Sequence, residues 1–377
     1  MKAVIAGYAR SPFHFARKGA LAGTRPDDLA AQVVRGLLDR TGLDPDLVED
    51  VILGCAYPEA AQGNNLGRIV GLLAGLPVEA GGMTINRFCG SSMQAIHIAA
   101  ANIECGVGEA YLCVGVESMT MVPQGGFNFS SHHGLREATD AYLPMGDTAE
   151  NVAARWNVSR AVQEQLAVES HRKAAAAREE GRLAGEIVAI RAGDDSVVDS
   201  DGCIRPTTSR DALAALKPMF RPEGTVTAGT SSPLTDGACA VLVASDTFAE
   251  RFALDPLARV KSFAVAGVDP AIMGMGPVPA TRKALARAGL SVSDLDVVEI
   301  NEAFASQALA CLRDLGLDPA RVNLDGGGLA IGHPLGATGA RITGKAASLL
   351  QRTGGRHALA TQCIGGGQGI ATVLERV

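Results

Sequence analysis

A cysteine at the junction between a strand and a helix is the first residue that could do chemistry. Residues 83–85 form a short apolar run, and Cys89 follows it just before a helical pattern over 91–103. The start of a helix presents unpaired N–H groups and a positive dipole end, which favour a thiolate over a thiol. A free cysteine is equally typical of a buried core. This stretch alone leaves both interpretations of Cys89 open.

Three stretches in the second half of the chain are polar or rich in glycine where a plain core would be apolar. Asn301 follows an expected strand, 297–300, and His333 lies in a glycine-rich loop before an expected helix, 340–350. Cys363 opens a tight glycine turn between two expected strands. Each has a plain structural explanation, because histidines are often partly buried and glycine turns connect strands. The glycines do not follow a first strand with an acidic residue at the expected distance, which disfavours a dinucleotide site.

Together these residues describe one kind of chemistry. A thiol at a helix start, a histidine, a second cysteine and exposed backbone N–H groups supply a nucleophile, a general base, a second acid/base and an oxyanion hole. No carboxylate pair, P-loop or metal-ligand spacing competes with them. The adjacent pair His132-His133 is a poor metal site, because neighbouring residues do not share a helix face. We expect no metal, and we expect His97 to be structural.

Composition limits the class of protein. The chain has 377 residues, 47% hydrophobic and 20% charged, which predicts two or three domains with a sizeable core. A net charge of −6 argues against nucleic acid or an anionic membrane as the main partner. The eight cysteines show no CxxC pair, so a disulfide framework is not expected. Without a signal-peptide pattern or a membrane-length apolar run, the expected location is cytoplasmic.

An internal repeat indicates how these residues are positioned. Strands alternate with helices, and the apolar runs in the strands predict an α/β fold with a largely parallel, covered sheet. A constant offset of 247 places the segment 40–43 on 287–290. Carried further without gaps, it pairs Asn86 with His333, Cys89 with Gly336, and Val116 with Cys363.

The repeat predicts two copies of one α/β unit, 1–118 and 248–377, with 119–247 inserted between them. Such a duplication brings corresponding strand ends together at a crevice, where α/β sheets bind ligands. We therefore expect Cys89, His333 and Cys363 to lie near one another although they are far apart in the sequence.

The chain resembles the thiolase family over essentially its whole length, and most closely the degradative 3-ketoacyl-CoA thiolases. This resemblance implies a duplicated α/β/α/β/α core of two pseudo-symmetric halves with an inserted loop domain. The motifs that carry it are the segments 86–95 (NRFCGSSMQA), 115–119 (GVESM), 225–232 (TVTAGTSS), 236–238 (DGA), 275–280 (MGPVPA), 301–304 (NEAF), 332–336 (GHPLG) and 363–369 (CIGGGQG).

The resemblance implies a role for each residue of the site. Cys89 is expected to be the nucleophile that becomes acylated, and His333 the group that activates it. Cys363 resembles the second acid/base, which protonates the departing acetyl-CoA carbanion and later deprotonates CoA. Asn301, holding a water beside His333, would form one oxyanion hole, and the backbone N–H groups of Cys89 and Gly365 would form the other.

The inserted region is similar to the loop domain of the family, which holds coenzyme A. Arg205 matches a position near the adenine and Ser232 one near the pantetheine, and Met145 is a third expected contact of CoA. Pro144 departs from short-chain biosynthetic members, which often carry histidine there. The chain is therefore expected to be an acyltransferase of fatty acid β-oxidation that cleaves 3-ketoacyl-CoA with CoA, through an acyl-cysteine, into acetyl-CoA and a shortened acyl-CoA.

Other functions remain as alternatives. A biosynthetic acetoacetyl-CoA thiolase would use the same residues to condense two acetyl-CoA. A decarboxylating ketoacyl synthase would carry a second histidine in place of Cys363, and a non-catalytic thiolase-like carrier would lack one of Cys89, His333 and Cys363. The expected partners are CoA thioesters and further copies of the chain, as a homodimer or homotetramer. A β-oxidation hydratase/dehydrogenase is a candidate partner.

Overall fold

The computed structural model describes all residues 1–377 and shows two halves built from matching elements. The first half contains β1 (Ala3–Arg10), β2 (His14–Phe15), α1 (Pro26–Thr41), β3 (Asp50–Gly54), α2 (Leu66–Ala74), β4 (Gly81–Ile85), α3 (Ser91–Glu104), β5 (Ala110–Ser118) and β8 (Thr235–Ser245). The second half contains β9 (Ala258–Gly267), α9 (Pro277–Ala288), β10 (Val297–Ile300), α10 (Ala305–Leu315), α11 (Gly328–Ile331), α12 (Leu335–Thr353), β11 (His357–Ile364) and β12 (Gln368–Glu375).

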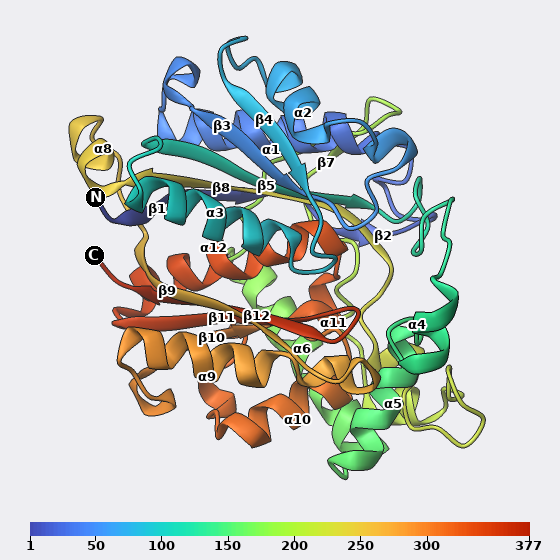
Figure 1. The fold of residues 1–377 in the computed structure, drawn as a ribbon. Coiled ribbons are helices and arrows are strands. Elements are labelled where there is room, and N and C mark those ends of the chain that lie inside the picture. The colour runs from blue at the N-terminus through green and yellow to red at the C-terminus, as the bar shows by residue number, and fades with distance from the viewer.

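The elements stack in five layers (Figure 1). One sheet has the strand order β4-β3-β5-β8-β1 and the other β9-β12-β11-β10, joined by a short pairing of β1 with β9. Helices α3 and α12 lie between the two sheets, α1 and α2 cover one outer face, and α9 and α10 cover the other. The central helices are mostly buried, because both of their faces pack against apolar sheet surfaces. The predicted duplicated core is confirmed.

The two halves follow the repeat found in the sequence. The offset of 247 carries Asp50 onto Val297, so that β3 corresponds to β10, and it likewise relates α3 to α12 and β5 to β11. Apart from the two-residue strand β2, only β4 has no strand as its counterpart, because α11 occupies the corresponding positions. The second half therefore has an α-helical turn where the first half has an edge strand.

The strand directions differ from the prediction of a largely parallel sheet. Strands β3, β4 and β5 are parallel to one another, as are β10 and β11. However, β8 runs antiparallel to β1 and β5, and β12 antiparallel to β9 and β11. The prediction was wrong because a buried apolar run looks the same in either direction. The glycine turn between β11 and β12 is also too short for a parallel crossover.

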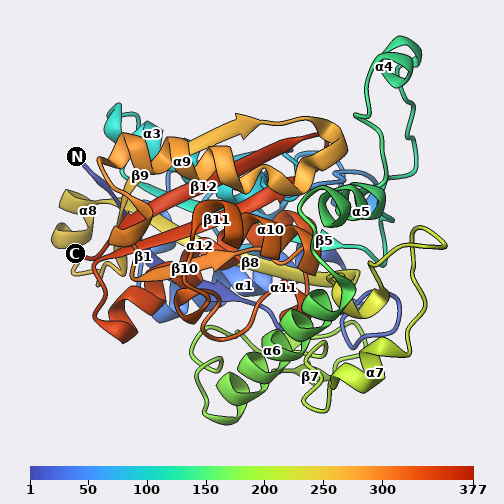
Figure 2. The same cartoon turned by 90° about the horizontal axis from the view of Figure 1, so that it is seen from below.

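The connecting segment holds α4 (His133–Ala138), α5 (Met145–Arg155), α6 (Arg160–Glu179), β6 (Ile190–Arg191), β7 (Val197–Val198) and α7 (Arg210–Ala214), and α8 (Asp246–Arg251) follows β8. Most of these elements lie at one end of the layered core, with α4 and α7 on opposite sides of it (Figure 2). Strand β8 falls inside the predicted insertion, 119–247, yet it is a central strand of the first sheet. The excursion away from the core therefore covers 119–234. None of the helices combines the length and apolarity needed to cross a membrane.

Candidate active site

A cavity of about 790 Å³ opens at the end of the core where the two halves and the connecting segment meet. Its lining includes Cys89 from the first half and His333, Cys363 and Gly365 from the second. The structure thus brings together residues that the sequence separates by more than half of the chain. Asn301 is not part of the lining; it is fully buried and reaches the cavity through His333.

Cys89 lies in a sharp turn between β4 and α3. Phe88, the residue before it, has a φ of 43°, in the left-handed region that a bulky residue rarely adopts. Side chains hold this turn: Asn86 Oδ1 accepts a hydrogen bond from the Phe88 N–H at 2.7 Å, and Ser91 Oγ accepts one from Arg87 N–H at 2.8 Å. Strain at this point is compensated by local hydrogen bonds, which is common where a reactive side chain must be aimed.

The thiol of Cys89 is held in its neutral form. Burial raises its pKa to about 12, although the backbone N–H groups of Gly365 and of Cys89 itself act on the sulfur and lower the pKa. The sequence-based expectation of a stabilised thiolate was therefore wrong in its net direction. The helix start does supply N–H groups, but loss of solvent outweighs them. Two N–H groups that converge beside a nucleophile can also stabilise the oxygen of a carbonyl that it attacks.

His333 precedes α12, and its imidazole lines the cavity. Its Nδ1 lies 2.6 Å from Thr338 Oγ1, and that hydroxyl donates its own proton to the Pro334 carbonyl at 3.1 Å. With its proton donated to Pro334, Thr338 can accept a hydrogen bond from Nδ1–H, and this assignment leaves Nε2 unprotonated. Burial, with a smaller contribution from Arg341, lowers the pKa of His333 to about 3. The imidazole is thus neutral, which is the form that can accept a proton.

Asn301 is fixed beside His333 by the end of β10. Its Nδ2 lies 3.3 Å from His333 Nε2. Asn323 holds the neighbouring backbone by accepting from Ile300 N–H at 2.9 Å and donating to Ile300 O at 3.0 Å. Asn323 also donates to Glu302 Oε1 at 2.7 Å, which fixes the turn that follows. A positioned amide next to an imidazole can stabilise negative charge on a nearby oxygen.

Cys363 is buried at the end of β11, directly before the glycine turn. Burial raises the pKa of its thiol well above the usual range, and the nearby Cys89 raises it further. Gly366 and Gly367 have φ values of 78° and 83°, which lets the hairpin turn at once and leaves the Gly365 N–H facing Cys89. Gln362 donates to the carbonyl of Cys89, tying this hairpin to the nucleophile turn.

The three residues expected to contact CoA also line the cavity. Arg205 and Ser232 lie on the side of α7, and Met145 lies near Gly365, whose added Cβ would sit 3.4 Å from the Met145 sulfur. Ser232 N–H donates to the Ala303 carbonyl at 2.9 Å, which ties the connecting segment to the turn after β10. The structure brings all of the predicted site residues to one place, and their roles remain predictions.

Sequence reasoning missed Lys18 and Thr338. Lys18 Nζ lies 4.7 Å from the centre of the Phe15 ring, and the Arg205 guanidinium lies 5.0 Å from the same ring. Both cations line the cavity, but a lone lysine in a loop carries no motif. Thr338 is inside the glycine-rich loop already singled out, and its distance of five residues from His333 at a helix start was the available indication.

Known proteins resemble this chain over its full length. Residues 3–247 match the family described as "Thiolase, N-terminal domain", and residues 254–376 match "Thiolase, C-terminal domain". A 3-ketoacyl-CoA thiolase of Shewanella sp. (strain MR-7) is 49% identical over 387 aligned residues, covering all of both chains. One of Saccharophagus degradans is 47% identical, covering 99% of this chain and 98% of its own. The crystal structure of human mitochondrial 3-ketoacyl-CoA thiolase in complex with CoA superposes with a TM-score of 0.92 at 38% identity, over 100% of this chain and 98% of that one.

Proposed function

The chain belongs to the thiolase family of acyltransferases, which use CoA as substrate, and we propose that it cleaves 3-ketoacyl-CoA to acetyl-CoA and a shortened acyl-CoA. One observation carries this proposal: a single cavity joins a neutral thiol, a neutral imidazole, a second thiol and two converging N–H groups. Carbon–carbon cleavage leaves an enolate, so it requires a proton donor and charge stabilisation at two separate oxygens.

The first half of the reaction makes an acyl-cysteine. The sulfur of Cys89 bonds to the 3-keto carbon while its proton passes to His333 Nε2, and the N–H groups of Cys89 and Gly365 stabilise the oxyanion. The bond between the second and third carbons then breaks. Its electrons form the enolate of acetyl-CoA, whose thioester oxygen lies beside His333 and Asn301. The Cys363 thiol protonates the second carbon and becomes a thiolate, and acetyl-CoA leaves.

The second half transfers the acyl group. The Cys363 thiolate takes the proton of an incoming CoA thiol, and the CoA sulfur attacks the acyl-cysteine carbonyl in the same oxyanion hole. When the tetrahedral intermediate collapses, Cys89 leaves and recovers its proton from His333. All three groups return to their neutral starting forms, in agreement with the raised pKa values of both thiols and the lowered pKa of His333.

Two cations in the cavity lining, Lys18 and Arg205, support the proposed binding of CoA. Lys18 and Arg205 stand near Phe15, and neither forms an ion pair within the chain. We propose that they bind the phosphates of CoA, while Ser232 and Met145 lie along the pantetheine. Free cations at the mouth of a neutral cavity are suited to an anionic substrate.

The direct test is the nucleophile. Replacement Cys89→Ala removes the sulfur from a partly exposed turn, so the fold should persist while thiolysis of 3-ketoacyl-CoA falls to background, by more than about 10³-fold. Full residual activity would refute the mechanism. Thiolysis measured across chain lengths, beside condensation of acetyl-CoA, separates degradation from acetoacetyl-CoA synthesis. Pro144, at the start of α5 in the cavity wall, favours degradation.

The setting of the enzyme is also a proposal. Edge strand β4 is partly exposed at one end of the first sheet, which supports a homodimer or homotetramer, and sedimentation would give the number of subunits. All eight cysteines are free, which supports a reducing, cytoplasmic setting. Copurification would test whether a hydratase/dehydrogenase partner binds.

A further inference from the structure

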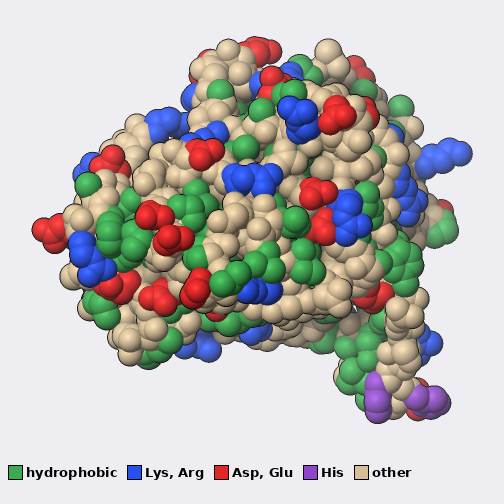
Figure 3. Space-filling model, turned by 90° about the horizontal axis from the view of Figure 1, so that it is seen from above, with side chains coloured by type: hydrophobic (Ala, Val, Ile, Leu, Met, Phe, Trp, Pro, Cys, Tyr) green, Lys and Arg blue, Asp and Glu red, His purple; other side chains and the backbone are tan.

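Part of the wall of the cavity is an arm that projects from the core. This α4 arm, residues 123–143, leaves the first half after β5 and returns at α5 (Figure 1). Figure 3 shows it projecting from the body, with histidines near its tip and hydrophobic side chains along its stem. Phe129 lies in the segment before α4 and Tyr142 in the segment after it, and both line the cavity.

The arm side of the cavity differs in chemistry from the CoA side. The permanently charged lining residues, Lys18 and Arg205, belong to the side of β2 and α7, and the lining residues of the arm include no charged side chain. In Figure 2, α4 and α7 lie well apart on the two sides of the same end of the molecule. An uncharged wall cannot serve the phosphates, but it stabilises an alkyl chain by removing it from water.

A continuous set of side chains connects this wall with the nucleophile. Tyr57 and Cys89 both pack against one small apolar cluster, and the ring centre of Tyr57 lies 6.0 Å from that of Phe88, the residue before Cys89. Tyr57 also lies beside Gly125, at the base of the arm, whose N–H acts on its hydroxyl. An acyl chain on the Cys89 sulfur therefore has an apolar path past these rings to the arm.

The arm has a defined geometry. At its base, Glu59 accepts hydrogen bonds from Phe127 N–H at 2.8 Å and Asn128 Nδ2 at 3.3 Å. At its centre, the Tyr142 hydroxyl accepts from His132 N–H at 3.1 Å, and the Phe129 and Tyr142 rings meet edge to face at 5.8 Å. The hydroxyl is therefore engaged within the arm, and the rings are held together at the cavity wall.

We propose that the α4 arm is the specificity wall for the acyl chain, and that Phe129 and Tyr142 select linear 3-ketoacyl chains long enough to reach them. This inference rests on the proposed thiolytic function and adds which residues set the preference for chain length. Short substrates such as acetoacetyl-CoA end near Cys89 and gain nothing from the arm.

The experiment measures kcat/KM for thiolysis of 3-ketoacyl-CoA with four, eight, twelve and sixteen carbons, in wild type and in Tyr142→Ala and Phe129→Ala. For twelve carbons and more we expect a fall of about tenfold, the effect of two methylenes losing apolar contact. For four carbons the change should stay within twofold. Tyr142→Phe keeps the ring and should retain the preference for long chains.

Phe127→Ala is the matched control, because Phe127 is exposed on the same arm but does not line the cavity. It should leave every chain length unchanged. Equal losses for four and twelve carbons, with or without a change in subunit number by sedimentation, would overturn the proposal, because the arm would then be structural. No loss at twelve carbons would also overturn it. If wild type cleaves no 3-ketoacyl-CoA of any length, the proposed function itself fails.

Discussion

At the scale of single residues, the site works with neutral groups. The thiol of Cys89 and the imidazole of His333 both hold their uncharged forms because burial disfavours their ions. In the proposed mechanism, proton transfer therefore accompanies bond formation at the substrate carbonyl, and the two N–H groups would offset the new charge. This arrangement explains why a hydrogen bond on the far side of the imidazole matters: it decides which nitrogen can accept the proton.

Thr338 is accordingly expected to be a positioning residue. Thr338→Val keeps the shape of the side chain but removes the acceptor for His333 Nδ1–H, leaving a buried donor unpaired at a cost of about 1–3 kcal/mol. We expect kcat to fall by roughly 5- to 100-fold with little change in KM, and Thr338→Ser to restore most of it. Steady-state kinetics of both variants provide the check. A rise in KM alone would instead place Thr338 in substrate binding.

Cys363 is expected to act in proton transfer. Cys363→Ala should still fold and form some acyl-enzyme, while turnover falls by ~10²–10⁴-fold, the usual contribution of a general acid/base. Mass spectrometry of the protein after mixing with substrate would detect the acyl-cysteine. If the variant loses its folded structure and not only its turnover, the role of Cys363 is structural.

At the scale of elements, the start of α12 lies against the ends of β3 and β5 with almost no space between the backbones. A Cβ added to Gly336 would lie 2.6 Å from the Val116 carbonyl oxygen and 2.7 Å from that of Gly54. These contacts join the first turn of α12 to the ends of β3 and β5. Glu117 strengthens the junction by accepting a hydrogen bond from Gly336 N–H at 2.9 Å. The close approach holds His333 against the half that carries Cys89.

Gly336→Ala should therefore disturb both stability and chemistry. Because the clash is with backbone, we expect a loss of about 1–3 kcal/mol in the free energy of unfolding, together with lower kcat. Urea unfolding and steady-state assays would measure both effects. Gly185→Ala is the control, since an added Cβ there meets nothing within 4 Å. Similar stability losses in the two variants would show that the close approach has no special importance.

The sequence predicted most of the fold and site, for identifiable reasons. The repeat at an offset of 247 predicted the duplicated core, because β3, α3 and β5 have the same spacing along the chain as β10, α12 and β11. The predicted strand direction was wrong for β8, because this strand returns to the core only after a long excursion whose path no local sequence pattern indicates. The neutral state of Cys89 was also missed, because burial depends on segments distant in the chain. Lys18 and Thr338 could not be identified from the sequence, because their roles depend on contacts made only in the folded chain, with the cavity and with His333.

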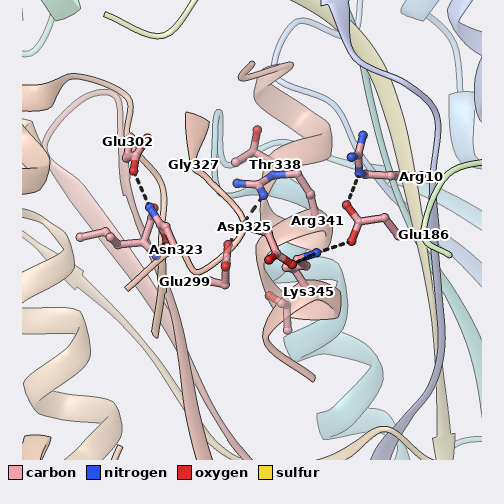
Figure 4. Close-up of polar contacts among 12 residues, drawn as sticks. Arg10, Glu186, Glu299, Glu302, Asn323, Asp325, Gly327, Thr338, Arg341 and Lys345 are labelled. Atoms are coloured by element: carbon pink, nitrogen blue, oxygen red, sulfur yellow. Dashed lines mark hydrogen bonds and ion pairs between the residues drawn. The ribbon is translucent and has the colours of Figure 1, made fainter. Parts of the chain in front are cut away.

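At the scale of the whole molecule, buried ion pairs join the layers. Glu186, from the connecting segment, binds Arg10 of β1 at 2.8 Å and Lys345 of α12 at 2.9 Å (Figure 4). Lys345 also binds Asp325 at 2.7 Å, and Arg10 binds Asp201 at 2.7 Å. One carboxylate thus links the first half, the excursion and the central helix of the second half.

Glu186→Gln should reveal the value of this link. Burial raises the pKa of Glu186, but Lys345 and Arg10 outweigh it and bring the pKa down to about 2. Removing the charge leaves Arg10 paired with Asp201 alone and Lys345 with Asp325 alone, so we expect a loss of about 1–3 kcal/mol in the free energy of unfolding. Chemical denaturation would measure it. Arg172→Met, which breaks an exposed pair with Glu169, should cost at most about 1 kcal/mol. Equal effects of the two changes would contradict the prediction.

The stability of the molecule should also fall in mild acid. Burial lowers the pKa of His97 and of His333 to about 3, so between about pH 6.5 and 3 the unfolded chain binds more protons than the folded one. Each such histidine weakens folding by about 1.4 kcal/mol per pH unit as pH decreases through this range. Burial raises the pKa of Glu299 to about 7, so between about pH 4.5 and 7 the folded chain binds a proton there that the unfolded chain does not. In that range Glu299 offsets the destabilising effect of one histidine.

Urea unfolding between pH 7 and 4 would measure the dependence. His97 bonds to Thr372 Oγ1 at 2.8 Å and stacks on Phe263, so His97→Gln lowers the overall stability. The informative effect of this substitution is on the slope of the free energy of unfolding against pH, which should decrease by the contribution of about one proton. An unchanged slope would mean that His97 does not contribute to acid unfolding.

The division of the site between the two halves has a consequence for the protein during its synthesis. Gln362 contacts Cys89 and follows it in the sequence by 273 residues. Cys363 is the next residue after Gln362. At roughly 5–20 residues per second, a ribosome needs about 14 to 55 seconds to cover this distance. Throughout that interval the emerging chain carries Cys89 without its base, its oxyanion hole or its second thiol. Under the proposed mechanism, efficient acylation of Cys89 therefore begins only once the hairpin of β11 and β12 has docked beside it.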